Sequence, residues 1–331
     1  MTAQSRRSFM AAAIGAAMFA TAHRLAAAPG LWEFRRLGAA FGTTVSMLVP
    51  HDDAASARQA LDAASAEIRA IERAASLFTP ASDINRLNRY GALSAPNFRL
   101  VELLRLAAKF HRRTGGSFDI TVQPYWAARS TATTLGRAAT DAELLAARAK
   151  GTFESVAVDR GGIRFVNPGM GIALNGIARG YATDRVIKLL QDAGIRHALI
   201  DTDGFGTLGQ NRDRPWSVAI AHPRQPGAVL GEIAPLTGFL STSSDHASAF
   251  SPDLRDNHIF TPATGCSPLE LASATVLAPT GAQADALSTA LMVLGARRGL
   301  DLIASLPGRH AIVATKDGKV CFTAGAPFAA M

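Results

Sequence analysis

Cysteine is scarce in this chain, whose 331 residues include only Cys266 and Cys321. Two thiols do not make up a disulfide framework, although one bridge between them is compatible with an oxidising compartment. The chain has no Cys-x-x-C pair and no cluster of His with Cys, which excludes the usual zinc-site patterns. Neither cross-links nor zinc are therefore expected to organise this protein.

Long apolar runs and dense basic runs are also missing. The apolar run over residues 11–20 is too short to cross a bilayer, and no other stretch reaches the roughly 20 apolar residues of a membrane-spanning helix. The 34 Lys and Arg exceed the 26 Asp and Glu, but no Lys/Arg-rich run forms a nucleic-acid footprint. This diffuse positive charge is compatible with an anionic ligand or with a membrane-attached partner, and it does not distinguish the two.

The start of the chain has the pattern of an export signal. Ser5-Arg6-Arg7-Ser8-Phe9-Met10 is a twin-arginine signature, followed by a short apolar run over residues 11–20. Ala26-Ala27-Ala28 before Pro29 fits a signal-peptidase site. We expect residues 1–28 to be a twin-arginine signal peptide and residues 29–331 a single domain in the periplasm. The alternative is a buried N-terminal helix.

Hydrophobic periodicity in the remaining chain predicts helices interspersed with hairpins. Helices are expected over residues 54–75, 82–88, 100–114, 177–193, 282–294 and 296–305, and strands over 43–49, 153–159, 163–166, 197–200, 216–221, 273–278 and 311–314. Residues 127–142 are rich in Ala, Thr and Arg and suggest a surface insertion or a short-helix loop. This mixture indicates an α+β fold with mixed or antiparallel sheets, not a doubly wound parallel sheet.

The strongest chemical signal is the pair Asp285 and Thr289. Residues four apart in a helix project from one face, so a carboxylate and a hydroxyl lie one turn apart. Oxygen ligands of this kind suit a hard cation such as Mg²⁺, which commonly bridges to substrate phosphates. Taken singly, however, Asp285 is also compatible with a helix cap, and Thr289 with a hydrogen bond to its own helix.

Four other segments contain candidate binding groups. His258 precedes a Pro/Thr/Gly turn that would present a general base, although an isolated histidine is more often structural. Gly115-Gly116-Ser117-Phe118-Asp119 either brings backbone amides and an acid to a ligand or simply caps a helix. Arg179 lies at the start of the helix that follows Asn175-Gly176, where its charge and the helix N-terminus together favour binding of a phosphate. The alternative is a solvated arginine at an ordinary N-capped helix. Residues 241–245 are polar and suggest a ligand-lining loop or a turn.

In their order and spacing these motifs resemble the ApbE family, the FAD:protein FMN transferases. The resemblance runs from Gly42 to Gly295 and rests on residues 42–44, 82–88, 114–121, 176–184, 258–265 and 285–289. It implies a two-lobed fold in which FAD binds between the lobes with Mg²⁺ beside its pyrophosphate. It also implies transfer of FMN to a threonine hydroxyl of a membrane or periplasmic redox protein, with release of AMP.

Residue roles follow from the same resemblance. Asp285, Thr289 and the main-chain carbonyl of Gly176 correspond to metal ligands, and His258 to the base that takes the proton of the acceptor hydroxyl. The positions assigned to flavin-nucleotide contacts are Phe41, Phe78, Ser117, Phe118, Asp119 and Arg179.

The chain also departs from the family pattern. Arg179 replaces the usual Lys, Phe41 the usual Met, and Ala173 a common Asp. Asp203-Gly204-Phe205 stands where a Gly-Gly-Asp/Asn turn is expected, and Ser244 where a glycine is usual. Because these departures cluster on the flavin side, two alternatives stay open. One is a flavin carrier that has lost transfer activity, and the other is an FAD pyrophosphatase in which water replaces the threonine.

Overall fold

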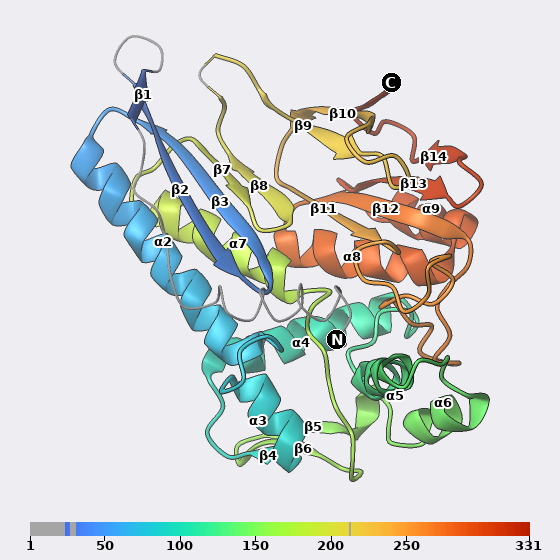
Figure 1. Ribbon diagram of the computed structural model, residues 1–331. Helices are drawn as coiled ribbons and strands as arrows, with labels where there is room; N and C mark the ends of the chain where they lie inside the picture. The colour runs from blue at the N-terminus through green and yellow to red at the C-terminus, as the bar shows by residue number, and fades with distance from the viewer. Residues whose placement is uncertain (1–23, 27–30, 212) are drawn as a thin grey trace.

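The computed structural model describes residues 24–26, 31–211 and 213–331 (Figure 1). The twin-arginine motif and the apolar run predicted to follow it lie outside these residues. Strand β1 (Arg24–Ala26) pairs antiparallel with β2 (Trp32–Ala40). Within the described ranges no helix combines the length and the apolarity needed to cross a membrane.

A nine-stranded sheet forms the centre of the molecule, with the order β1-β2-β3-β7-β8-β11-β12-β13-β14. Its other members are β3 (Thr43–His51), β7 (Ala198–Asp201), β8 (Gly204–Leu208), β11 (Phe239–Ser244), β12 (Leu271–Ala278), β13 (His310–Thr315) and β14 (Val320–Phe322). Every pairing along this order is antiparallel. The predicted α+β class with antiparallel sheets is therefore confirmed.

Two small antiparallel sheets accompany it. The first has the order β15-β10-β9 and comprises β9 (Trp216–Ala221), β10 (Val229–Leu236) and β15 (Phe328–Ala330). The second has the order β4-β6-β5 and comprises β4 (Ala92–Leu93), β5 (Val156–Asp159) and β6 (Gly162–Phe165).

The described helices are α2 (Ala54–Ala75), α3 (Asp83–Tyr90), α4 (Phe98–Arg113), α5 (Gln123–Thr134), α6 (Asp141–Arg148), α7 (Ala178–Asp192), α8 (Gly281–Leu294) and α9 (Ala296–Ala304), with a short 3₁₀ turn at Phe153–Ser155. The main core lies between the large sheet and helices α2, α4, α7 and α8 (Figure 1). A second core, which includes Trp216 and Ile233, fills the space between the large sheet and the β9–β10 hairpin. The large sheet and its helices thus form layers, and α3, α5 and α6 lie with the β4-β6-β5 sheet in the lower part of Figure 1.

Local sequence signals explain where the helices of the site begin. Asp53 caps α2 by accepting hydrogen bonds from the amides of Ala55 and Ser56, and Thr280 caps α8 by accepting from the amide of Gln283. Such caps satisfy amides that have no partner inside the helix. The predicted bounds of α2 and β9 agree with the structure, and those of α7 and α8 agree within one residue.

Some predictions were wrong or incomplete. Residues 241–244, interpreted as a loop or turn, belong to strand β11 inside the large sheet. The segment 127–142 contains most of α5 and the start of α6, so it is mainly helical. Residues 117–121 form bends and turns that lead into α5. The sequence analysis did not predict strands β1, β2, β4, β8, β10, β14 and β15.

Candidate functional site

Asp285 and Thr289 project from α8 toward β11. One carboxylate oxygen of Asp285 accepts a hydrogen bond from the Ser241 hydroxyl at 3.3 Å. The Thr289 hydroxyl lies 3.2 Å from that of Ser243. Residues two apart in a strand share a face, as do residues four apart in a helix, so the two pairs match in register. Four oxygen-bearing side chains therefore line the interface between α8 and β11.

Gly176 lies next to Thr289, although the two residues are far apart in the chain. A Cβ atom built on Gly176 would be 2.8 Å from the Thr289 Oγ1 and 3.4 Å from the ring of Phe118. The backbone of the turn before α7 can approach the hydroxyl this closely only because position 176 has no side chain. The structure thus brings the three predicted metal ligands and one predicted flavin contact together.

The first turns of α7 and α8 pack in direct backbone contact. Gly180 and Gly281 face each other so closely that a Cβ on Gly180 would lie 2.1 Å from the Gly281 carbonyl oxygen. The Gly180 amide donates to the second oxygen of Asp285 at 3.1 Å. Asp184 accepts from the amides of Gly281 and Ala282, and burial raises the pKa of its carboxyl to about 6. The two helices are therefore joined through both glycines and both carboxylates.

Burial raises the pKa of the Asp285 carboxyl, whereas the nearby Arg179 guanidinium opposes this shift. Arg179 donates to the Asp203 carboxylate at 2.6 Å. Asp203 has a φ of 71°, a left-handed conformation that is rare for a residue other than glycine. Arg179 also lowers the pKa of His258, after burial as the larger cause. Its charge thus acts on both the candidate metal carboxylate and the candidate base.

His258 lies in the long connection between β11 and β12 and is half-buried. Its Nδ1 is 2.9 Å from the carbonyl oxygen of Ser248, which also accepts the His258 amide at 3.0 Å. A carbonyl can only accept, so Nδ1 carries the proton and Nε2 keeps its lone pair. Because burial lowers the pKa of His258, the ring is neutral near pH 7. A neutral imidazole with a free Nε2 has the properties of a general base.

Ser117, Phe118 and Asp119 lie on the turn after α4. Phe118 is buried, and its carbonyl is 3.1 Å from Nδ1 of His111. Asp119 accepts from the amide and the hydroxyl of Thr121 at 2.8 and 2.7 Å, and burial raises the pKa of its carboxyl. These contacts fix the turn beside Gly176.

Phe41 lies in the β2–β3 turn next to Gly42, and Phe78, from the connection between α2 and α3, packs on that glycine. Phe41 is buried with a φ of 53°, and its amide donates to Glu72 at 3.0 Å. The ring of Phe78 is 59% exposed and packs on Gly42, where an added Cβ would lie 3.0 Å from a ring carbon. The exposed Phe78 ring provides an apolar face for a planar ligand at this turn.

The chemistry of the donor set fits a hard cation. In the part of the chain that the structure describes, no three His, Cys, Asp or Glu side chains group as a metal site. One carboxylate, one hydroxyl and one carbonyl at Asp285, Thr289 and Gly176 suit Mg²⁺, which keeps several waters and takes further oxygens from phosphates.

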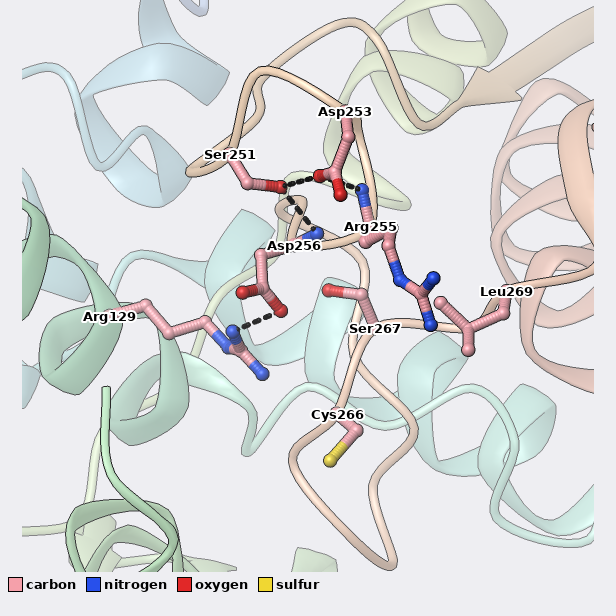
Figure 2. A pocket seen from close by; sticks show the side chains of 8 residues that line it. All are labelled: Arg129, Ser251, Asp253, Arg255, Asp256, Cys266, Ser267 and Leu269. Carbon is pink, nitrogen blue, oxygen red and sulfur yellow. Dashed lines mark hydrogen bonds and ion pairs between the residues drawn. The ribbon is translucent and has the colours of Figure 1, made fainter. Parts of the chain in front are cut away.

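Two cavities lie away from these donors. One of about 330 Å³ is formed by α5 and the connection that carries His258, and Figure 2 shows its lining by Arg129, Ser251, Asp253, Arg255, Asp256, Cys266, Ser267 and Leu269. Its two arginines and two aspartates give no net charge. The other, of about 620 Å³, is bordered by α4, α7 and the start of α8. Cys266 and Cys321 are both free thiols.

Sequence reasoning missed the roles of Ser241 and Ser243 in this site. Their alternation was visible within the polar run at 241–245, but its low apolar content favoured a loop. The strand assignment depends on pairing with β8 and β12 on either side, which no local pattern contains.

The chain is similar to one protein family over most of its length. Residues 41–313 match the model of the ApbE family. The chain is 31% identical over 217 residues to the FAD:protein FMN transferase of Salmonella typhimurium, covering 62% of this chain and 61% of the relative. It is 31% identical over 230 residues to that of Vibrio cholerae, covering 66% and 68%. The matched segment thus spans about three fifths to two thirds of these relatives.

The fold agrees over a longer span. The solved flavin transferase ApbE from Vibrio cholerae superposes with a TM-score of 0.75 at 25% identity, covering 89% of this chain and 98% of the other. The family match includes the Gly176 turn, β11, His258 and the Asp285–Thr289 pair. This chain therefore belongs to the ApbE family.

Proposed function

We propose that this protein transfers the FMN half of FAD to a threonine hydroxyl of an acceptor protein, releasing AMP, with Mg²⁺ as cofactor. The observation that carries the proposal is the meeting of Asp285, Thr289 and Gly176 beside Phe118. Hard oxygen donors and an aromatic ring in one place suit a flavin nucleotide whose diphosphate binds a cation. The names of the two relatives support the same substrate.

Each group of residues in the proposed site has a separate role. Asp285, Thr289 and the Gly176 carbonyl would hold Mg²⁺, which would offset charge that grows on the diphosphate oxygens during displacement. Arg179 would contact a phosphate oxygen, since its guanidinium already pairs with an anionic oxygen of Asp203. Phe41, Phe78, Ser117, Phe118 and Asp119 would orient the flavin nucleotide.

His258 would take the proton of the acceptor threonine. A threonine hydroxyl is a weak nucleophile until a base removes its proton. The hydrogen bond from Nδ1 to Ser248 leaves Nε2 as the accepting atom. The oxygen of the acceptor then attacks the phosphorus that carries the FMN, and AMP leaves.

The proposal is tested by incubating the protein with FAD, Mg²⁺ and competent acceptor proteins, followed by in-gel flavin fluorescence after denaturation. A fluorescent acceptor band that requires both Mg²⁺ and Asp285 is expected. AMP release without an acceptor would favour the pyrophosphatase alternative instead. Tight FAD retention without AMP release would favour a flavin carrier.

We further propose that the protein acts in the periplasm on a membrane or periplasmic redox subunit. The twin-arginine motif at Arg6-Arg7 supports this location. The redox acceptor is the partner that the family resemblance implies. Fractionation of cells with and without the twin-arginine translocase tests it. Equal amounts in the periplasm of both strains would contradict export by this route.

A further inference from the structure

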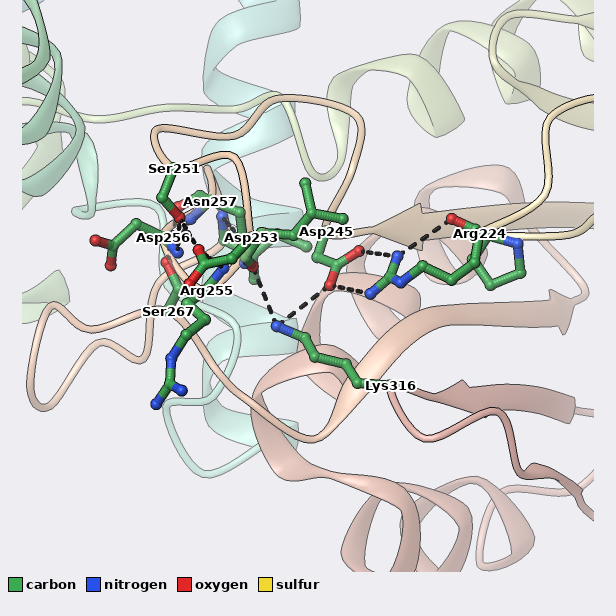
Figure 3. A network of polar contacts seen from close by, with 12 residues as sticks. Arg224, Asp245, Ser251, Asp253, Arg255, Asp256, Asn257, Ser267 and Lys316 are labelled. Carbon is green, nitrogen blue, oxygen red and sulfur yellow. Dashed lines mark hydrogen bonds and ion pairs between the residues drawn. The ribbon is translucent and has the colours of Figure 1, made fainter.

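The connection that carries His258 is anchored by a buried carboxylate. Asp245, the first residue after β11, is fully buried and accepts two hydrogen bonds from the Arg224 guanidinium, at 2.8 and 2.7 Å. The Lys316 ammonium lies 3.3 Å from the same carboxylate (Figure 3). Ionised carboxylates are buried only when they are paired, and here two cations hold one acid.

The two cations come from elements that are distant in the chain. Arg224 lies between β9 and β10, and Lys316 directly follows β13. The Lys316 ammonium also donates to the carbonyl of Leu254 at 3.1 Å (Figure 3). Lys316 therefore holds the connection at a second point beyond Asp245.

Ser248 lies between these two attachment points, and its carbonyl sets the orientation of the His258 ring. That oxygen accepts from both the amide and Nδ1 of His258. A bridge between Ala249 and Asn257 pairs the two sides of the same segment. Displacing the segment at Asp245 or Leu254 would therefore move the atom that fixes the imidazole.

We propose that Asp245, Arg224 and Lys316 form a latch that positions His258 for proton transfer. The three are positioning residues, because each acts through the 245–258 segment and not on substrate. The inference rests on the proposed role of His258 as base. A buried ion cluster contributes little net stability over apolar side chains of the same size, so its main effect is on geometry.

The first variants are Asp245→Asn, which removes the charge at constant shape, and Lys316→Met, which removes the second attachment and leaves Arg224 paired. We expect kcat for FMN transfer to fall about 100-fold in Asp245→Asn, the cost of a displacement of about 1 Å. The KM for FAD should stay unchanged, because the proposed flavin contacts lie on other elements. The fall should be smaller for Lys316→Met.

Glu67→Gln provides a matched control. Glu67 is another mostly buried carboxylate between two cations, Arg99 at 3.0 Å and Arg185 at 3.1 Å, but it lies on α2. Its loss should reduce stability and leave kcat unchanged. In a His258→Ala background, Asp245→Asn should have no further effect, because residues that act through one group are not additive.

Amide hydrogen exchange measures how well the latch orders its segment, independently of FMN transfer. Residues 246–258 should exchange faster in Asp245→Asn and Lys316→Met but not in Glu67→Gln. Unchanged exchange in both latch variants, or an undiminished kcat loss in the His258→Ala background, would overturn the proposal. If exchange responds as expected while the wild-type protein labels no competent acceptor, the proposed function falls and the latch stands as a device that orders this segment.

Discussion

Replacing Gly180 by alanine tests the contact on which the geometry of the site depends. The added Cβ would lie 2.1 Å from the Gly281 carbonyl oxygen, 2.4 Å from its carbon and 2.8 Å from the Ala282 amide nitrogen. All three are backbone atoms and cannot rotate away. Carbon–oxygen contacts are ordinarily about 3.3 Å or longer, so α7 and α8 would have to separate by about 1 Å.

Three contributions determine how much Gly180→Ala changes the free energy of unfolding. Overpacking a tight contact costs about 1–3 kcal/mol. Separation would also weaken the 3.1 Å hydrogen bond from the Gly180 amide to Asp285, a kind worth roughly 1.5–3 kcal/mol when the acceptor is charged. Alanine returns up to about 1 kcal/mol through its higher helix propensity. We therefore expect Gly180→Ala to lower the free energy of unfolding by about 2–4 kcal/mol and to reduce FMN transfer.

Urea denaturation and the in-gel transfer assay measure the two effects. Gly194→Ala is the control: Gly194 follows the C-terminal end of α7 with a φ of 80°, and an added Cβ there meets no atom within 4 Å. It should cost about 1–2 kcal/mol through left-handed strain and leave transfer intact. If Gly180→Ala changes stability by less than about 0.5 kcal/mol, as surface substitutions do, the close helix contact is refuted.

Three further predictions concern the same region. Asp285→Asn should fold, but its rate of FMN transfer should fall at least about 10²-fold, as when a charge-stabilising group is removed. Titration of the activity with Mg²⁺ tests this prediction. A normal Mg²⁺ response would contradict the role of Asp285 as a metal ligand. Because the pKa of Asp184 is raised to about 6, its folded form binds the proton more tightly, so stability falls as pH rises from about 4 to 6. That fall is up to about 3 kcal/mol, and Asp184→Asn should remove it in urea titrations across this window. Arg179→Ala should raise the KM for FAD about tenfold, because it removes a charge-assisted hydrogen bond worth roughly 1.5 kcal/mol. Asp203→Ala should change the free energy of unfolding by no more than about 1 kcal/mol, because the Arg179–Asp203 pair is partly exposed.

The sequence predicted well those elements that depend only on neighbouring residues in the chain. Helix α2 agrees to the residue because its apolar period and its Asp53 cap lie in one stretch of sequence. The Asp285–Thr289 pair was predictable for the same reason, since helical spacing alone puts both side chains on one face.

The remainder of the site depends on contacts between distant segments. The approach of Gly176 to Thr289 and of Gly180 to Gly281 follows from the packing of α7 on α8, and neither glycine carries a local signal of its partner. Strand β11 has a Ser/Thr-rich sequence that gains its conformation from its neighbours, as in the 2.8 Å contact of Thr242 with Thr275. The latch was unpredictable for the same reason, because Asp245, Arg224 and Lys316 lie on segments that are distant in the chain.

The ion pair of Arg179 with Asp203 joins two positions at which this chain differs from the pattern that its family resemblance implies. Arginine in place of lysine keeps the positive charge, and the aspartate in place of glycine uses that charge as its counter-ion. A homologue with an acid at the position of Asp203 should therefore carry a cation at the position of Arg179. A variant that makes residue 179 uncharged should also remove the acid at 203, because an aspartate there without a cation would repel the carboxylate at 285.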